Sequence, residues 1–239
     1  MSLSRILFLC FASLSGLVHG VRAQSAQEIV NKHLEALGGK EKLQSINSLY
    51  LEGVAVLENG TRVDMKTWRV YDRLYRQEIA LPGGNMVVIV TPRQGWSFSP
   101  QTTGVFKPLS PEQFRILKPE IDPVGPLVDY NAKGNKVELA GKDTVDGHDC
   151  YKLKVYFPSG LAAMYFIDAK TWYVLRETHR SGDEAGGNTT IDYKDYTIIP
   201  GGYIFPYTIT VSRYGARISV SKYRINSTID TDALSRPNK

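Results

Sequence analysis

The sequence predicts an α+β protein organised around one large antiparallel β-sheet that curls on itself. The clearest observation is the stretch 145–180, where three segments alternate apolar and polar residues between short turns of Asp, Gly and Pro. Alternation with a period of two, interrupted by such turns, is typical of an antiparallel meander. The same pattern recurs along the chain and predicts roughly ten or eleven strands, with helices in only two regions. A sheet of that size must curl, split or close, so we expect an unclosed barrel whose concave apolar face is covered by helices.

The first 23 residues have the features of a secretory signal peptide. Arg5 gives a positive start, residues 6–18 form a short apolar core, and residues 21–23 form a small-x-small cleavage site. An uncleaved membrane anchor is the alternative, but the apolar run is too short and is interrupted by Ser and Gly. We therefore expect an exported, periplasmic protein. Its mature part, residues 24–239, is predicted to be a single domain because no linker divides it.

The composition of the mature part argues against a disulfide scaffold and against a nucleic-acid partner. Cys150 is its one cysteine, so no internal disulfide can form, and we expect burial as a small apolar side chain. The formal charge falls from +5 to +3 when Arg5 and Arg22 leave with the signal peptide. So small and dispersed an excess does not indicate nucleic-acid binding. Basic strand segments, such as residues 152–154 and 69–76, are predicted to be solvated faces.

A helix is predicted to open the mature chain. Ser25 and Glu28 have the spacing of a capping box, in which each side chain bonds the backbone of the other residue. Apolar residues and His33 then recur at helical spacing, and Gly38 and Gly39 end the helix. A short second helix over residues 40–45 is expected to follow. The first helix has a single apolar side, which must dock on another element.

Strand segments follow, and a helical region then interrupts them. The predicted strands cover residues 49–57, 61–70, 71–81, 86–91 and 96–100. Ser110 and Pro111 have the pattern of a helix start, with Phe114 and Leu117 on its apolar side. The chain is then punctuated by Pro and Gly up to residue 134, with one further helical piece expected at residues 127–132.

The second half of the chain returns to strands and ends in a tail. The predicted strands cover residues 136–139, 150–157, 161–167, 172–179, 189–198, 203–213 and 216–225. In the tail, residues 226–239, Leu234 and Pro237 are expected to pin the last segment.

No motif of known catalytic chemistry is present. His33, His148 and His179 lack metal-ligand spacing, and the sequence contains neither a G-x-S-x-G elbow nor a phosphate-binding loop. The sequence therefore predicts a protein without enzymatic activity, metal or cofactor. A secreted hydrolase would instead need a polar cleft that gathers Asp, Glu or His side chains from distant strands.

Aromatic residues are the notable feature of the predicted strands. The chain has 14 Tyr, 8 Phe and 3 Trp, and many of them fall in strand segments. They are either the packed core of a sheet sandwich or the lining of an apolar cavity inside a curled sheet. Composition alone leaves both interpretations open.

Several phrases of the sequence resemble the LolA-like family of outer-membrane lipoprotein-sorting carriers. They are residues 93–100 (Arg-Gln-Gly-Trp-Ser-Phe-Ser-Pro), 141–147, 151–153 and 165–171, in an order of helix, strands, helical interruption and second meander. The resemblance implies an unclosed antiparallel barrel, lidded by helices, that shields the acyl chains of a lipoprotein from water. Each buried CH₂ group stabilises such a complex by about 0.8 kcal/mol.

The resemblance also implies a set of site residues. The apolar cavity is expected to be lined by strand and helix residues, namely Met65, Trp68, Trp96, Phe98, Phe114, Leu117, Met164, Phe166 and Trp172. In the carriers a basic residue near an early strand hydrogen-bonds the lid, and Arg73 is its nearest counterpart here. Leu74 follows it where the family usually has proline.

Two functional hypotheses follow from the sequence. The first is a periplasmic, non-enzymatic carrier or sensor, acting as a monomer without a cofactor. Its partners would be lipid or lipoprotein acyl chains and the envelope proteins that release or accept lipoproteins, with no nucleic acid. The second is a structural or interaction module of the cell envelope with a fully packed interior.

Overall fold

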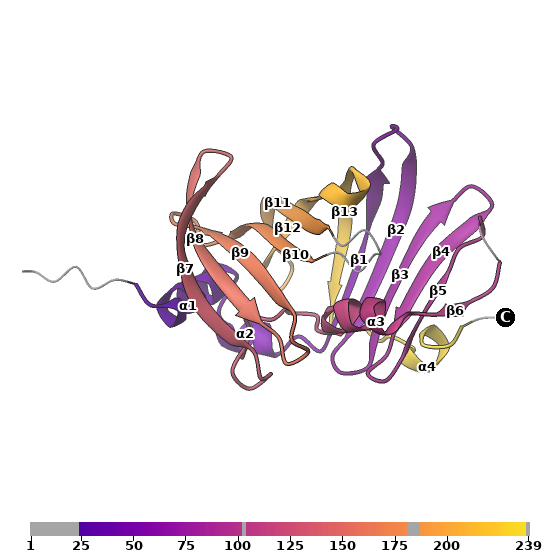
Figure 1. Ribbon diagram of the computed structural model, residues 1–239, viewed down its shortest axis with the longest axis horizontal. Helices are drawn as coiled ribbons and strands as arrows, with labels where there is room; N and C mark the ends of the chain where they lie inside the picture. Colours follow the sequence, from indigo (N-terminus) through magenta and orange to yellow (C-terminus); the bar gives the residue numbers. More distant parts are fainter. Residues whose placement is uncertain (1–23, 102–103, 181–186, 238–239) are drawn as a thin grey trace, which may run out of the picture.

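The computed structural model describes residues 24–101, 104–180 and 187–237. The predicted signal peptide, residues 1–23, lies outside the described residues. Within them the chain forms strands, α-helices and two 3-10 turns, η1 and η2 (Figure 1). In chain order the elements are α1 (Ala26–Ala36), α2 (Lys40–Gln44), β1 (Ser48–Val56), β2 (Arg62–Val70), β3 (Leu74–Leu81), β4 (Gly84–Val90), β5 (Gly95–Phe98), β6 (Lys107–Pro108), α3 (Pro111–Leu117), η1 (Lys118–Ile121), β7 (Lys136–Val145), β8 (His148–Tyr156), β9 (Ala162–Asp168), β10 (Val174–Arg180), β11 (Asn188–Ile199), β12 (Tyr203–Val211), η2 (Ser212–Tyr214), β13 (Ala216–Ile225) and α4 (Thr231–Leu234).

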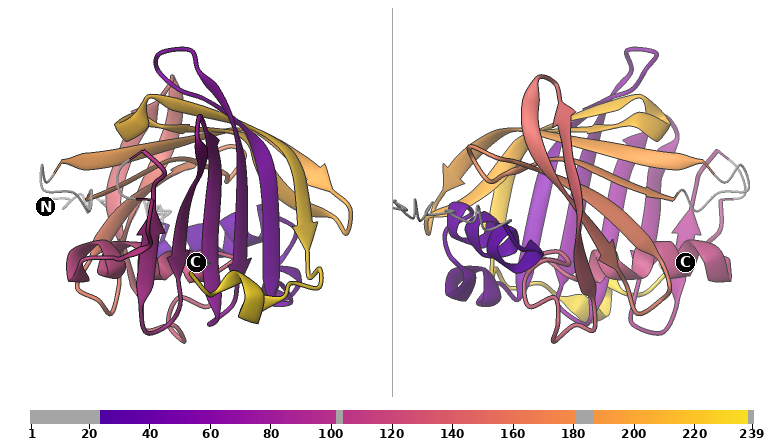
Figure 2. Two further views of the ribbon diagram at one scale, coloured as in Figure 1. Left: turned by 90° about the vertical axis from the view of Figure 1, so that its right-hand side faces the viewer. Right: turned by 60° about the vertical axis from the view of Figure 1, so that its left-hand side comes forward.

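All described strands belong to one 13-stranded antiparallel sheet, ordered β6-β5-β4-β3-β2-β1-β13-β12-β11-β10-β9-β8-β7. The sheet consists of two meanders, a first one of β1–β6 and a second one of β7–β13. They are joined through β1 and β13, which pair although they lie at opposite ends of the chain. Its two edges, β6 and β7, do not pair, so the sheet curls without closing (Figure 2). The predicted fold class, a curled antiparallel sheet with a few helices, is confirmed.

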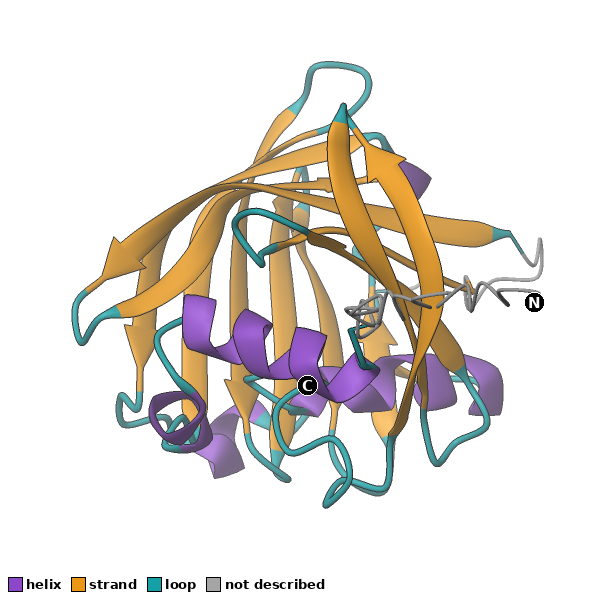
Figure 3. Cartoon of the chain, turned by 90° about the vertical axis from the view of Figure 1, so that its left-hand side faces the viewer, coloured by secondary structure: helices purple, strands orange, loops and turns teal. Residues whose placement is uncertain are grey.

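The helices form where the sequence places their caps. Ser25 and Glu28 make the predicted capping box at the start of α1. Ser110 and Gln113 make a second one at the start of α3. Figure 3 shows the helices lying across the lower part of the curled sheet. No helix in the described part of the chain is long and apolar enough to cross a membrane.

The connection from β6 to β7 differs from the prediction. The helical piece expected at residues 127–132 is a series of turns, and a 3-10 helix forms earlier, at Lys118–Ile121. Asp129 has φ 50°, a left-handed conformation that a right-handed helix cannot include. We call residues 109–135 the cross-connection, because it joins the two edges of the sheet.

The C-terminal tail covers part of the convex face. Leu234 of α4 packs with Leu74, Val87 and Ile89, as the sequence predicts for this residue. Arg76 holds the tail in place, since its Nη1 donates to the Leu234 carbonyl at 2.9 Å and its Nε to Glu78 at 2.7 Å. The prediction of a solvated basic face at residues 69–76 is therefore wrong for Arg76, whose side chain is 6% exposed.

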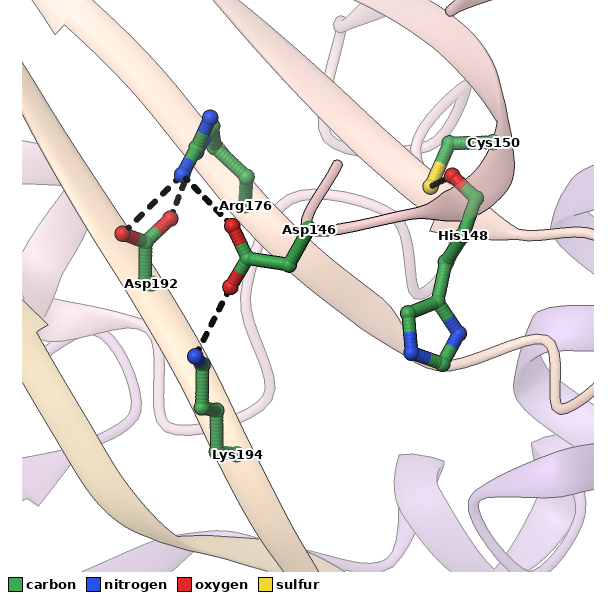
Figure 4. Close-up of polar contacts among 6 residues, drawn as sticks. All are labelled: Asp146, His148, Cys150, Arg176, Asp192 and Lys194. Carbon is green, nitrogen blue, oxygen red and sulfur yellow. Dashed lines mark hydrogen bonds and ion pairs between the residues drawn. The ribbon is translucent and has the colours of Figure 1, made fainter. Parts of the chain in front are cut away.

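Charged side chains brace the outer face of the second meander (Figure 4). Arg176 donates to both carboxylate oxygens of Asp192, at 2.6 and 3.2 Å. Asp146, in the turn between β7 and β8, accepts from Lys194 at 2.7 Å and lies 3.8 Å from Arg176. This network fixes the tip of the β7–β8 hairpin to β10 and β11.

Candidate functional site on the concave face

The pairing register assigns each strand residue to one face of the sheet. Side chains of directly opposed residues share a face, and neighbours along a strand alternate. Ala55 is paired with Val63 on one side and with Ile218 on the other, and Ile218 is paired with Ile209. These residues therefore lie on one face. It is also the face on which α1 and α3 pack, inside the curl of the sheet, so it is the concave one (Figure 3).

Helices cover the two ends of the concave face. At the end formed by β8 and β9, Ile29, Val30 and Leu34 of α1 pack with Leu153 and Ile167. At the end formed by β3 and β4, Phe114, Leu117 and Ile121 of the cross-connection pack with Tyr75 and Val90. Each end is therefore a small closed core.

Between these two cores lies an apolar surface that we call the apolar strip. Among the described residues its cluster consists of side chains from β1, β2, β3, β12 and β13 and the residue after β1, with no helix residue. Its centre is buried by its neighbours, whereas its outer members are only half-buried. The members are Leu51, Ala55, Leu57, Val63, Met65, Ile79, Leu81, Tyr207, Ile209, Val211, Ile218, Val220 and Tyr223.

A polar group borders the apolar strip on β9, β10 and β11. Glu177 accepts a hydrogen bond from the Tyr193 hydroxyl at 3.0 Å, lies 3.4 Å from Nδ1 of His179 and is also bonded by Tyr165. Burial, and then the charge of Glu177, raises the pKa of both tyrosines. The hydrogen bond to Glu177 raises the pKa of His179 above its ordinary value. The space enclosed by the concave face, which we call the hollow, is thus apolar along the strip and polar at its border.

A second polar contact ties the cross-connection to the sheet. Arg69 of β2 lies on the concave face and donates to Glu120 of η1. The sequence assigns the lid contact to Arg73, but Arg73 is exposed in the turn before β3, and Arg69 makes the contact to η1. The end of β2 at Val70 explains the difference, because Arg73 falls in the turn whereas Arg69 is on the strand and faces inward. Nor is Arg69 part of a solvated face, since its side chain is only 30% exposed.

The predicted cavity residues separate into several groups. Met65 lies in the apolar strip, and Phe114 and Leu117 lie on the cross-connection above Tyr75 and Val90. Trp96 and Phe98 pack on the convex face with the C-terminal tail. Trp68, opposite Tyr50, is on the convex face as well, with ring centroids 5.3 Å apart.

The remaining predicted residues come from the second meander. Met164 and Phe166 are paired with Lys154 and Lys152, which places them on the outer face. Trp172 lies in the turn after β9 and packs against the core under α1, where its ring stacks on that of Tyr151 at 5.6 Å. The structure therefore gathers Met65, Phe114 and Leu117 around the hollow and places the other six elsewhere.

Sequence reasoning missed most members of the apolar strip. Ile209, Val211, Ile218 and Val220 belong to β12 and β13, strands that we predicted without assigning their faces. Their signal was present, because residues 216–220 alternate small or branched apolar residues with Arg and Ser. The sequence contains no local signal that β13 pairs with β1.

Among the described residues, Cys150 and the histidines do not form a catalytic pair. The Cys150 thiol contacts the backbone carbonyl of His148 at 3.5 Å, and the His148 ring points away from it (Figure 4). Burial raises the pKa of Cys150 to about 11, which disfavours the reactive thiolate. No group of His, Cys, Asp and Glu able to hold a metal occurs in the described part of the chain.

Comparison with known proteins identifies the fold. No protein-family profile matches the chain, and no curated protein sequence does either. A solved LolA superfamily protein from Nitrosomonas europaea is similar with a TM-score of 0.57 and 15% identity, over 90% of this chain and 99% of that one.

Two further structures agree. A DUF1329 family protein from Desulfovibrio piger has a TM-score of 0.57 and 15% identity, over 90% of this chain and 98% of that one. A Vibrio parahaemolyticus domain named for outer membrane lipoprotein sorting has a TM-score of 0.52 and 14% identity, over 88% and 100%. At such identities the likeness concerns the fold alone. The chain has a LolA-like fold.

Proposed function

From this fold and its concave face we propose that the protein is an exported, non-enzymatic carrier that shields acyl chains on the apolar strip. The main support for this proposal is that helices cover both ends of the concave face but not the strip between them. The strip consists of strand residues and the residue after β1, and its margin is half-buried. A half-buried apolar surface inside a curled sheet can exchange water for a ligand's hydrocarbon. Ten methylene groups would contribute about 8 kcal/mol before the cost of ordering the chain.

Each element around the strip then has a role in the carrier. The cross-connection acts as the lid, and the Arg69–Glu120 ion pair holds it to β2. The ligand class is the acyl chain of a lipid or lipoprotein, with envelope release and acceptor proteins as partners. Export through a cleaved signal at residues 1–23 would place the carrier in the periplasm as one mature domain. The alternative, a structural module, requires a filled interior. The half-buried margin of the strip favours the carrier instead.

Replacing Ile79 by Glu is expected to weaken the binding of a fluorescent fatty acid by at least about tenfold, because it places a carboxylate against hydrocarbon. Ile79 is a half-buried member of the strip. The matched control is Ala80→Glu, since Ala80 is the exposed next residue on the opposite face. Titration of the mature protein measures both. Equal affinities for Ile79→Glu, Ala80→Glu and the wild type would contradict the proposal.

Replacing Arg69 by Met is expected to loosen the lid. The stem of the side chain is kept while the ion pair to Glu120 is lost, and a pair of this kind contributes about 1 kcal/mol. Hydrogen exchange of residues 109–121 should rise about fivefold, as should the dissociation rate of the bound fatty acid. Arg73→Met, at an exposed turn residue, is the control and should change neither rate. Equal effects of the two substitutions would remove Arg69 from this role.

A further inference from the structure

Strands β12 and β13 pair along only part of their length. Their ladder covers Thr208–Val211 of β12 and Ala216–Ser219 of β13. By contrast, β13 pairs with β1, and β12 with β11, along nearly their whole lengths. Residues 203–207 and 220–225 therefore border an opening in the sheet, which we call the seam, and the two strands diverge in Figure 1.

A β-bulge explains where the pairing ends. The register of β1 with β13 shifts between Glu52 and Gly53 and leaves Ser221 as the additional residue of β13. The Ser221 hydroxyl donates to the Glu52 carbonyl at 3.1 Å and stabilises this geometry. A bulge increases the local twist of its strand, so β13 turns away from β12 at this point.

The β12 side of the seam is suited to a strand edge that has no partner. Pro206 has no N–H to donate, and proline within a sheet is confined to positions where no neighbour needs that donor. Its carbonyl accepts instead from the hydroxyl of Tyr223, across the seam. The Tyr223 ring also stacks on Phe205 at 5.0 Å. The seam is thus bridged by a side chain in place of a backbone ladder.

A cavity of about 360 Å³, open to solvent, lies at the end of the seam farthest from the paired residues, and its volume is within the range of small-molecule sites. One wall comes from the β11–β12 hairpin and the other from the end of β13. The lining includes Tyr223 and Ile225, which face the hollow, and Arg224, which faces outward. Because residues of both faces line it, the cavity lies in the plane of the sheet.

The chemistry of this cavity changes from the inside to the outside. Tyr223 belongs to the apolar strip. Arg224 is exposed, and its guanidinium lies over the face of Tyr50, 5.9 Å from the ring centroid. On the concave side, Lys42 lies 5.7 Å over the ring of Tyr203, another lining residue. The outer mouth presents Arg224, which has no carboxylate partner among the described residues.

We propose that the seam is a side portal through which a ligand with one acyl chain extends from the apolar strip to the outer face, where Arg224 binds its anionic head group. This inference rests on the proposed function. The head group is a carboxylate or a phosphate monoester, because the guanidinium of arginine bonds both through two parallel N–H groups. The Tyr223–Pro206 contact is the point that the chain must pass.

The experiment compares four probes on the mature protein: a long-chain fatty acid, its methyl ester, a 1-acyl-glycerol-3-phosphate of the same chain, and inorganic phosphate. The wild type should bind one or both anionic amphiphiles at least about tenfold more tightly than the neutral ester. Inorganic phosphate should not displace them. Arg224→Gln should lose this preference while keeping the affinity for the ester, and Arg224→Lys should keep part of it.

Arg217→Gln is the matched control, because Arg217 is an exposed residue at the opposite end of β13. It should keep the full preference. Equal binding of acid, phosphate and ester by the wild type would overturn the portal while leaving the carrier function intact, as would a preference that survives Arg224→Gln. Displacement by inorganic phosphate alone would show a free-anion site and also overturn it. Failure of every acyl probe to bind would overturn the proposed function itself.

Discussion

Replacing Gly53 by Ala is expected to destabilise the protein by about 3 kcal/mol, the cost of forcing an atom into a packed backbone. A Cβ atom at this position would lie 2.4 Å from the carbonyl oxygen of Ser219 and 2.9 Å from the Cα of Val220. Both are backbone atoms, so no side-chain rotation can relieve the overlap. Urea unfolding of the mature wild-type and variant proteins, followed by tryptophan fluorescence, measures the difference in the free energy of unfolding.

The matched control for this prediction is Gly187→Ala. A Cβ atom added at Gly187 would meet no heavy atom of the described residues within 4 Å, and Gly187 has no left-handed φ. This substitution should therefore change the free energy of unfolding by no more than about 0.5 kcal/mol. A loss below about 1 kcal/mol for Gly53→Ala would mean that β13 can move away from β1.

The sequence predicted most of the elements because their signals are local. The capping box of Ser25 and Glu28 and the Ser110–Pro111 helix start lie within one turn of the helix that they begin, and both form. The short turns of the second meander likewise join neighbouring strands. The pairing of β1 with β13 has no such signal, because these strands lie at opposite ends of the chain.

The face of each aromatic residue could not be predicted for a different reason. Both faces of the first meander bury apolar side chains, one under the cross-connection and the other under the C-terminal tail. Trp96 and Phe98 therefore show the same large apolar character as residues inside the hollow, although they pack against Leu234. The sequence of a strand does not indicate that a segment distant in the chain will cover one of its faces.

His33 is expected to make the protein less stable as the pH falls from about 6.5 to about 4. It is buried, and burial lowers its pKa from 6.5 to about 4, although the hydrogen bond to the Trp172 carbonyl opposes this. The Nδ1 atom lies 2.8 Å from that carbonyl, so the neutral ring donates from Nδ1. Within this window the unfolded chain binds the proton and the folded chain does not. Stability is therefore lost at up to about 1.4 kcal/mol per pH unit.

Substituting His33 by Gln should remove this dependence, because the amide can still donate to the carbonyl but does not titrate. The difference in unfolding free energy between wild type and variant, measured by urea unfolding from pH 7.5 to 4, isolates the contribution of His33 from that of the carboxylates. His179→Gln provides a control of opposite sign. The pKa of His179 is raised through Glu177, so its contribution is present below pH 6.5 and is lost as the pH rises through the folded value. A His33→Gln profile parallel to the wild type would show that the buried ring accepts a proton without cost.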